Sequence, residues 1–87
     1  MKDWLEAIAL NRELKWIDLR VLLVLLANVQ GSSVEISQAS IAQKLGIEAS
    51  NISRSIKKLK ENRIIEPKLI AGKLVGYRFL IDESEQV

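Results

Sequence analysis

Cysteine and histidine are both missing from this chain of 87 residues. Their absence excludes disulfide bonds, thiolate–zinc sites and catalysis by a cysteine or histidine nucleophile or a histidine base. We therefore expect neither a metal nor a cofactor. A lack of cysteine also fits a reducing compartment, so we expect a cytoplasmic protein.

Long apolar runs are missing as well. The longest, Val21 to Ala27, is far shorter than the ~20 residues that a membrane-spanning helix needs. The chain starts with MKDWLEAIAL, which combines a short apolar stretch with acidic side chains and does not have the pattern of a signal peptide. We expect no membrane partner.

Enzyme motifs are present only as fragments. Ser55 and Lys58 have the S-x-x-K spacing of serine acylases, but no S-D-N or K-T-G motif accompanies them. Gly72-Lys73 lacks the earlier glycine of a phosphate-binding loop. We expect the protein not to be an enzyme.

The composition that remains is that of a soluble globular domain, with 48% hydrophobic and 28% charged residues. A chain of this length suffices for one hydrophobic core. We expect residues 1–87 to form a single domain.

The net charge of +2 is unevenly distributed along the chain. Residues 1–36 carry four basic and five acidic side chains, residues 37–80 carry nine and three, and residues 81–87 carry three acidic side chains and no basic one. Positive charge is thus concentrated in residues 37–80, where a polyanion such as nucleic acid is expected to bind. A charged face that is merely solvated is the alternative.

Residues 38–63 have the spacing of two helices joined by a tight turn. Apolar side chains at helical spacing predict the buried faces: Ile41, Ala42 and Leu45 in the first helix, and Ile52, Ile56 and Leu59 in the second. Gly46 supplies the turn, because a residue without a Cβ adopts a positive φ easily. Ile47 fills the corner, and the small Ala42 allows close approach. This combination is typical of a DNA-binding helix-turn-helix.

A short helix is predicted near the start, from Asp3 to Leu10, with Asp3 as its N-cap. Its apolar side contains Trp4, Leu5 and Ile8. Trp4 belongs either to the core or to a dimer contact. A polar joint follows at residues 11–15.

The strongest helical pattern spans Trp16 to Gln30, with Asp18 as the expected N-cap and Gly31 as the C-terminal stop. Its apolar side chains form a stripe that extends around much of the helix: Leu19, Leu22, Leu23, Leu26 and Val29, widened by Val21, Val24 and Leu25. A helix this apolar must be covered on more than one side. Either it is central to the domain or its outer side joins a partner subunit.

Gly31 to Ser33 should form a turn, and Val34 to Ile36 alternate like a short strand. Ser37 is the expected N-cap of the first motif helix, with Ser40 as a second candidate.

After Arg63 the pattern changes to that of a β-hairpin. A strand begins at Ile64, and Pro67 confines it to a sheet edge or a strand end. Residues 71–73 form the turn, and residues 74–81 form the returning strand.

Within the returning strand, Gly76 marks a bulge or a close backbone approach. Tyr77 and Phe79 are expected in the core, with base stacking as the alternative. Residues 82–87 read as an acidic, frayed tail.

This order of elements, together with the segment IAQKLGIEASNISRSIKKLKENRIIEPK, resembles the winged helix-turn-helix domain of multiple-antibiotic-resistance regulators (MarR type). Leu59, Glu61 and the Ile64-Ile65-Glu66 run match the usual ending, where the recognition helix turns into the wing. The resemblance implies an α+β, mainly α fold: a three-helix core, a short strand and a two-stranded C-terminal wing, with an extra N-terminal helix. The motif would span 38–63, the wing 64–81 and the tail 82–87.

The closing YRFLID also resembles the end of the wing in plasmid replication proteins of the RepL kind. One departure from both families concerns the recognition helix, where Glu48 and Ala49 precede Ser50 in place of a Ser or Thr cap. Glu48 suits the positive helix N-terminus but would repel a phosphate there. In winged-helix regulators an N-terminal helix often mediates dimerisation, so a homodimer is expected.

The side of the second motif helix opposite its apolar residues is expected to meet double-stranded DNA. Arg54 is the first choice for a base contact, because its planar fork matches guanine O6 and N7. Asn51 could pair with adenine, and Ser50 and Ser53 with a base or a phosphate. The remaining candidates are assigned to the DNA backbone or minor groove: Lys57 and Lys58 to phosphates, Gln38 and Gln43 to backbone contacts, and Lys73 and Arg78 to the wing contact.

These features predict a sequence-specific DNA-binding protein, a small bacterial, phage or plasmid transcriptional regulator with residues 49–62 as recognition helix. Two alternatives remain: the DNA-binding domain of a plasmid or phage replication protein, and a winged helix that serves protein–protein contact only.

Overall fold

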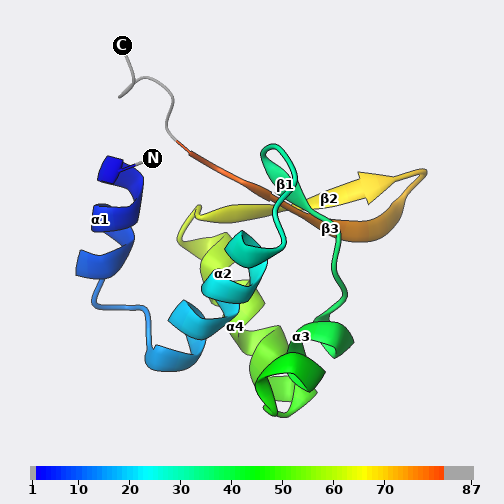
Figure 1. Ribbon diagram of the computed structural model, residues 1–87, viewed down its shortest axis with the longest axis horizontal. Helices are drawn as coiled ribbons and strands as arrows, with labels where there is room; N and C mark the ends of the chain where they lie inside the picture. The colour runs from blue at the N-terminus through cyan, green and yellow to red at the C-terminus, as the bar shows by residue number, and fades with distance from the viewer. Residues whose placement is uncertain (1, 82–87) are drawn as a thin grey trace.

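The computed structural model describes residues 2–81. A short strand, two helices and a hairpin follow two N-terminal helices, as Figure 1 shows. The elements are α1 (Lys2–Leu10), α2 (Trp16–Ala27), β1 (Ser33–Val34), α3 (Gln38–Leu45), α4 (Ala49–Glu61), β2 (Ile65–Ile70) and β3 (Lys73–Phe79). The acidic tail expected at 82–87 lies outside the described residues.

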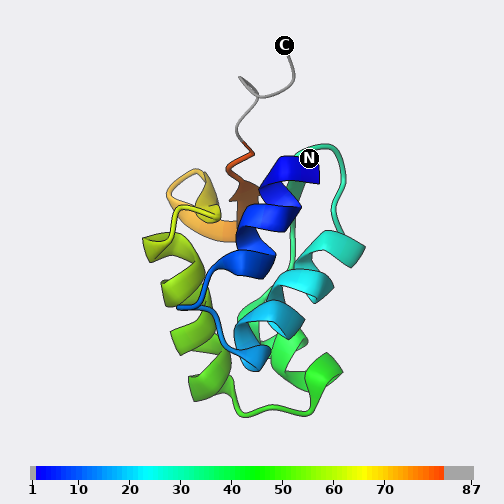
Figure 2. The same ribbon diagram turned by 90° about the vertical axis from the view of Figure 1, so that its left-hand side faces the viewer.

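The three strands form one antiparallel sheet in the order β1-β3-β2. Pro67 lies in β2, an edge strand, where its missing N–H costs no ladder hydrogen bond. The turn between β2 and β3 has positive φ at both Ala71 (52°) and Gly72 (79°), the backbone that a two-residue hairpin requires. The hairpin extends away from the helices on the side opposite α1 (Figures 1 and 2).

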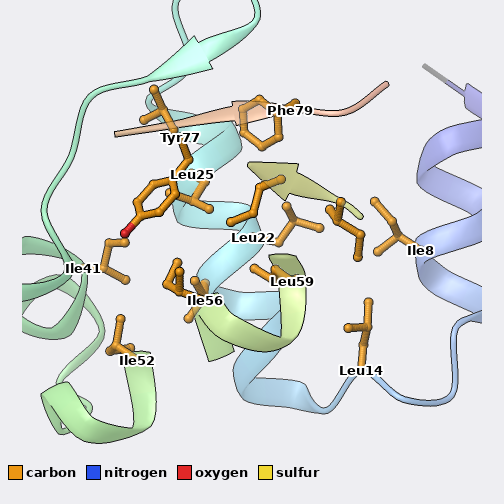
Figure 3. Close-up of a cluster of buried hydrophobic side chains, with 14 of the residues drawn as sticks. Ile8, Leu14, Leu22, Leu25, Ile41, Ile52, Ile56, Leu59, Tyr77 and Phe79 are labelled. Atoms are coloured by element: carbon orange, nitrogen blue, oxygen red, sulfur yellow. The ribbon is translucent and has the colours of Figure 1, made fainter. Parts of the chain in front are cut away.

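The core lies between α2, α3 and α4 on one side and the sheet on the other, and Figure 3 shows its central side chains. Tyr77 and Phe79 are both buried, which confirms the core placement over base stacking. Trp4 packs edge-on against Phe79, with ring centroids 5.9 Å apart. The N-terminal helix therefore joins the core through Trp4, and the dimer-contact alternative for this side chain is wrong.

Both predicted N-caps before the motif are wrong. Asp3 lies inside α1, which already includes Lys2. In α2 the N-cap is Lys15, and Asp18 is the third helical residue. Its carboxylate reaches back to accept the Lys15 backbone N–H at 2.7 Å, which satisfies a donor that the helix leaves free.

The end and the buried face of α2 also differ from the prediction. The helix ends at Ala27, and Gly31, with φ of 68°, lies in the following turn. The side chains that face the core are Asp18, Val21, Leu22 and Leu25, whereas Leu19 is 37% and Leu23 63% exposed. A helix that is apolar nearly all round gives no sequence signal for which face is inside.

Leu14 is a further difference, because it is buried within the joint that was expected to be polar. Together the elements form a winged helix-turn-helix fold with an extra N-terminal helix, as predicted. No helix within residues 2–81 has the length and apolarity to cross a bilayer.

Gly76 is required by a close backbone approach, and a bulge lies beside it. Lys68 pairs with Gly76 and Leu69 with Leu74, so Val75 is an extra residue in β3. A Cβ on Gly76 would lie 1.9 Å from the carbonyl oxygen of Val34. The bulge and the close backbone approach predicted at this glycine are therefore both confirmed.

We expect Gly76→Ala to lower the free energy of unfolding by about 3 kcal/mol or more, because the clash is with backbone rather than with a side chain that can move. Urea denaturation measures the loss. Gly72→Ala is the control: its Cβ meets nothing within 4 Å, so only the positive φ is penalised, by about 1–2 kcal/mol. Equal losses for the two variants would contradict the close approach.

Candidate nucleic-acid interface

The helix-turn-helix is held by the local contacts that its sequence predicts. The Ser37 hydroxyl accepts the Ser40 backbone N–H at 3.0 Å and caps α3, so Ser37 rather than Ser40 is the cap. Gly46 ends α3 in the left-handed conformation, with φ of 65°. The backbone N–H of Ile47 then donates to the Ala42 carbonyl at 3.1 Å. This turn fixes the angle at which α4 leaves α3.

One side of α4 is buried and the other is exposed. Ile52, Ile56 and Leu59 are almost inaccessible to solvent. The opposite side presents four exposed residues that were predicted to bind DNA: Ser50, Ser53, Arg54 and Lys57. We call these four residues the outer face of α4. The structure brings them onto one side of a 13-residue helix.

Arg54 and Asn51 are in direct contact at the start of this face. A guanidinium nitrogen of Arg54 donates to the amide oxygen of Asn51, one turn earlier in α4. The contact uses the oxygen of Asn51 but leaves most of the Arg54 donors free. Asn51 is half-buried and Arg54 is exposed. Asn51 therefore orients the arginine.

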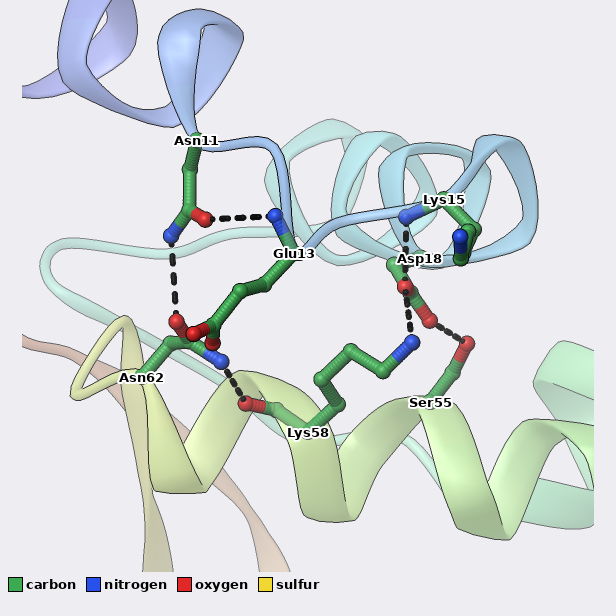
Figure 4. Close-up of polar contacts among 7 residues, drawn as sticks. All are labelled: Asn11, Glu13, Lys15, Asp18, Ser55, Lys58 and Asn62. Carbon is green, nitrogen blue, oxygen red and sulfur yellow. Dashed lines mark hydrogen bonds and ion pairs between the residues drawn. The ribbon is translucent and has the colours of Figure 1, made fainter.

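Lys58 has a different environment from its neighbour Lys57. Its ammonium group lies 3.1 Å from the carboxylate of Asp18, which is buried at the start of α2. The Ser55 hydroxyl donates to the other oxygen of the same carboxylate (Figure 4). Lys57, in contrast, makes no ion pair with any residue of the described 2–81 range. Both lysines are predicted to contact phosphates, but Lys58 already forms an ion pair with a carboxylate of the protein.

The environment of Asp18 sets its protonation. Burial alone raises the pKa of the Asp18 carboxyl, but three donors and one positive charge outweigh this effect. The Lys15 backbone N–H, the Ser55 hydroxyl and the Lys58 ammonium group together hold its pKa below the ordinary 3.8. Asp18 is therefore ionised at neutral pH and ties the first turn of α2 to the middle of α4.

A second polar contact ties the joint after α1 to the end of α4. The Asn11 amide donates to the side-chain oxygen of Asn62 at 3.1 Å, and the Asn62 amide donates to the Lys58 carbonyl at 2.9 Å (Figure 4). Asn11 also accepts the backbone N–H of Glu13 at 3.0 Å. Helix α4 is thus held near its centre and at its C-terminus.

The remaining predicted residues are scattered around the motif. Gln38 is half-buried and donates to the Tyr77 hydroxyl at 3.2 Å, whereas Gln43 is exposed on α3. Arg78 lies on β3 and forms an ion pair with Glu66 at 3.1 Å. Lys73 is exposed at the start of β3, beside the hairpin turn. Of these four, Gln43 and Lys73 make no side-chain hydrogen bond or ion pair within residues 2–81.

Sequence reasoning missed two features of this region. The local sequence predicts only an N-cap role for Asp18 and an incomplete enzyme motif for Ser55, because no local pattern shows that α2 and α4 bring the two side chains together. The wing is also more apolar than expected. Leu69, Ile70 and Leu74 are each more than half exposed around Lys73.

No group of three or more potential ligands suited to a metal ion occurs within the part of the chain that the structure describes. A shallow hollow of about 650 Å³ lies between β3 and the segment before α3. Its walls include Ile36, Gln38, Leu74 and Tyr77.

A family model described as the MarR family matches residues 13–71. This span covers α2, the helix-turn-helix and the first wing strand, β2, whereas β3 lies beyond it. The chain belongs to the MarR family. Regulators of the MarR family are generally non-enzymatic DNA-binding proteins, so the match indicates a DNA-binding transcription regulator. A comparison with curated proteins finds no match.

The Asp18 contacts predict how this MarR-family chain responds to acid. A carboxyl whose pKa is lowered by folding stabilises the protein above its unfolded pKa of about 3.9, and this contribution is lost as pH falls through the lower folded value. Asp18→Asn should therefore lower the free energy of unfolding by about 1.5–3 kcal/mol at pH 7. The difference from wild type should shrink below about pH 4.

Urea denaturation between pH 7 and pH 2.5 measures this difference. The control is Asp3→Asn, the same chemical change at an exposed position on α1. It should alter stability by less than about 0.5 kcal/mol. A difference for Asp18→Asn that is constant over the whole pH range would contradict the ionised, bonded carboxylate.

Proposed function

We propose that this protein is a sequence-specific double-stranded-DNA-binding transcriptional regulator, with α4 in the major groove and the β2–β3 wing on the flanking backbone or minor groove. The observation that carries the proposal is the outer face of α4, which is polar, cationic and opposite a fully buried side. An α-helix fits the major groove, and its exposed side chains then meet base edges. Residues 1–87 would act as a single DNA-binding domain.

Arg54 is the proposed base reader. Its guanidinium can donate two parallel hydrogen bonds to guanine O6 and N7. The bond to Asn51 holds the side chain against α4, so less side-chain entropy is lost on binding. In this arrangement Asn51 positions Arg54, and pairing of Asn51 with adenine would need that bond to break.

Lys57 and Lys58 have different proposed roles, one in binding DNA and the other in stabilising the fold. Lys57 is proposed to contact a phosphate, because it is exposed and has no internal carboxylate partner within residues 2–81. Lys58 is proposed to serve mainly the contact with Asp18, with any phosphate contact secondary. Ser50 and Ser53 lie beside Arg54 as donors for a base or a phosphate.

The wing and α3 would add weaker contacts. Lys73 is the proposed minor-groove cation, since a narrow groove concentrates negative potential. Arg78 and Gln38 would have to give up Glu66 and Tyr77 to reach DNA, whereas Gln43 is free to do so. Glu48 is the N-cap of α4 and is exposed, so its charge disfavours a phosphate at that helix end.

Arg54→Ala should relax the sequence preference, at a cost of about 1–3 kcal/mol for the preferred site and little for other duplexes. Selection from a random duplex pool, followed by fluorescence anisotropy on chosen sites, measures both. Arg54→Lys is the matched control, because it keeps the charge but loses the planar fork. An equal loss on all sequences would show that Arg54 contacts a phosphate.

The neighbouring lysines make a second matched pair. Lys57→Ala should reduce the slope of log K against log salt by about 0.9, the value for one lost phosphate contact, without changing stability. Lys58→Ala should instead lower the free energy of unfolding, because Asp18 loses its counter-ion. Salt titrations and urea denaturation of both variants separate the two roles. The reverse assignment would follow if Lys58→Ala alone changed the slope.

The exposed leucines and isoleucine of the wing favour a second candidate, a winged helix used for protein contact. An electrophoretic mobility shift with random duplex at low salt separates the two functions. The absence of a shift at micromolar protein would support the second candidate. Direct repeats among selected sites would instead indicate a replication origin.

A further inference from the structure

The end of the wing exposes large apolar side chains. Leu69 is 58% exposed, and Ile70 and Leu74 are each 53% exposed. The hairpin extends away from the helices (Figure 1), which leaves these side chains open to a partner. A contiguous exposed apolar patch marks an interaction site in many soluble proteins. We call residues 69–74 the wing tip.

The pairing of β2 with β3 sets the direction of these side chains. Leu69 pairs with Leu74, and Ile70 pairs with Lys73, directly before and after the two-residue turn. Successive side chains of a strand point to opposite faces of the sheet. Leu74 lines a hollow together with Tyr77, next to the segment before α3. The leucine pair therefore lies on the face towards the motif helices, and Ile70 and Lys73 lie on the other face.

Charge indicates what kind of partner suits the wing tip. Residues 67–81 contain three basic side chains, Lys68, Lys73 and Arg78, and no acidic one. Lys68 and Arg78 already have carboxylate partners, whereas Lys73 makes no ion pair with any residue of the described chain. An apolar tip with a free positive charge suits a polyanion that also has apolar surface. DNA provides both, as phosphates and as the flat faces of its bases.

We propose that the wing tip is an apolar wedge that enters the minor groove, unstacks one base step and kinks the duplex. Proteins that kink DNA from the minor groove insert side chains such as leucine and isoleucine between base pairs. This inference rests on the proposed function, because α4 must hold the adjacent major groove. It adds DNA bending to the cation contact proposed for Lys73.

The shape of the wing tip suits entry into a groove. Ala71 and Gly72 form the turn, so the end of the hairpin carries the two smallest side chains, on strands about 5 Å apart. The minor groove is about 6 Å wide. The larger side chains of Leu69, Ile70 and Leu74 come directly behind the turn, and they need more room than an undisturbed groove has. Bending the duplex towards the major groove at an unstacked step supplies that room.

The apolar character of the wing tip favours a wedge over a contact with the groove floor. The floor presents hydrogen-bond acceptors, which leucine and isoleucine cannot satisfy. Aliphatic side chains placed against it would remove water from these acceptors at a cost. Between two base pairs the same side chains lie against apolar ring faces, and their burial offsets the cost of unstacking. Lys73 then neutralises a phosphate at the groove wall.

A wedge creates sequence preference at base pairs that α4 does not touch. Pyrimidine–purine steps such as TA unstack more easily than other steps. The minor groove next to the major groove held by α4 is half a helical turn away, or about 5 base pairs. Selection from a random duplex pool should therefore enrich a pyrimidine–purine step about 5 base pairs from the bases read by Arg54.

Energy transfer between dyes at the two ends of a selected duplex measures the bend. Wild type should kink the duplex by about 20–90° for each bound wing tip. The double variant Leu69→Ala with Leu74→Ala should still bind, but with less than about half of that bend. Leu10→Ala is the matched control, because Leu10 is 72% exposed on α1, far from the wing in sequence. Circular dichroism verifies that all variants fold.

A mismatched duplex separates a wedge from a simple groove contact. A single mismatch at the preferred step is already partly unstacked, so wild type should bind it about tenfold more tightly than the paired duplex. The double variant should bind the two duplexes equally. Lys73→Ala should keep the preference for the mismatch and reduce only the salt dependence of binding.

Two results would overturn the wedge and leave the proposed function intact. One is a wild type that binds its selected site without bending it. The other is a bend that the double variant retains in full, or that Leu10→Ala removes as well. Absence of binding to any duplex would instead contradict the proposed function itself, and the wing tip would then belong to a contact with another protein.

Discussion

A buried carboxylate joins the two helices on which the rest of the structure depends. Asp18 is almost inaccessible to solvent, and a charge in that position is tolerated only when donors surround it. The Lys15 backbone, Ser55 and Lys58 supply them from two helices, so the first turn of α2 and the middle of α4 are held in one relative position. The apolar side chains around them contribute packing without a preferred direction, whereas these hydrogen bonds require each donor to lie close to the carboxylate.

The same contact shapes the candidate DNA-binding surface. It occupies Lys58 and leaves Lys57 free, although the two residues are neighbours in sequence and identical in chemistry. It also turns Ser55 inward, so the serines left on the outer face of α4 are Ser50 and Ser53. Membership of the MarR family indicates a DNA-binding regulator, and the geometry of α4 supports the proposed division between reading residues and supporting residues.

Much of the helix-turn-helix could be predicted because its signals are local. The cap by Ser37, the left-handed Gly46 and the spacing of Ile52, Ile56 and Leu59 each depend on residues within one or two turns. The wing could be predicted for a similar reason, since Pro67 excludes a central strand and Gly72 suits a two-residue turn. The predicted start and end of α2 were wrong. Asp18 and Gly31 each suit a standard cap position, but the helix is capped by Lys15 and Asn28 instead.

The sequence by itself determined the order of elements, the motif, the wing and the set of exposed cations, because periodicity and turn chemistry are encoded over short distances. Only the tertiary structure decided which side of α2 is buried, because a helix apolar nearly all round has no preferred side until its neighbours are in place. It also decided which lysine pairs with Asp18, because that partner lies 40 residues earlier in the chain at a contact that only folding creates.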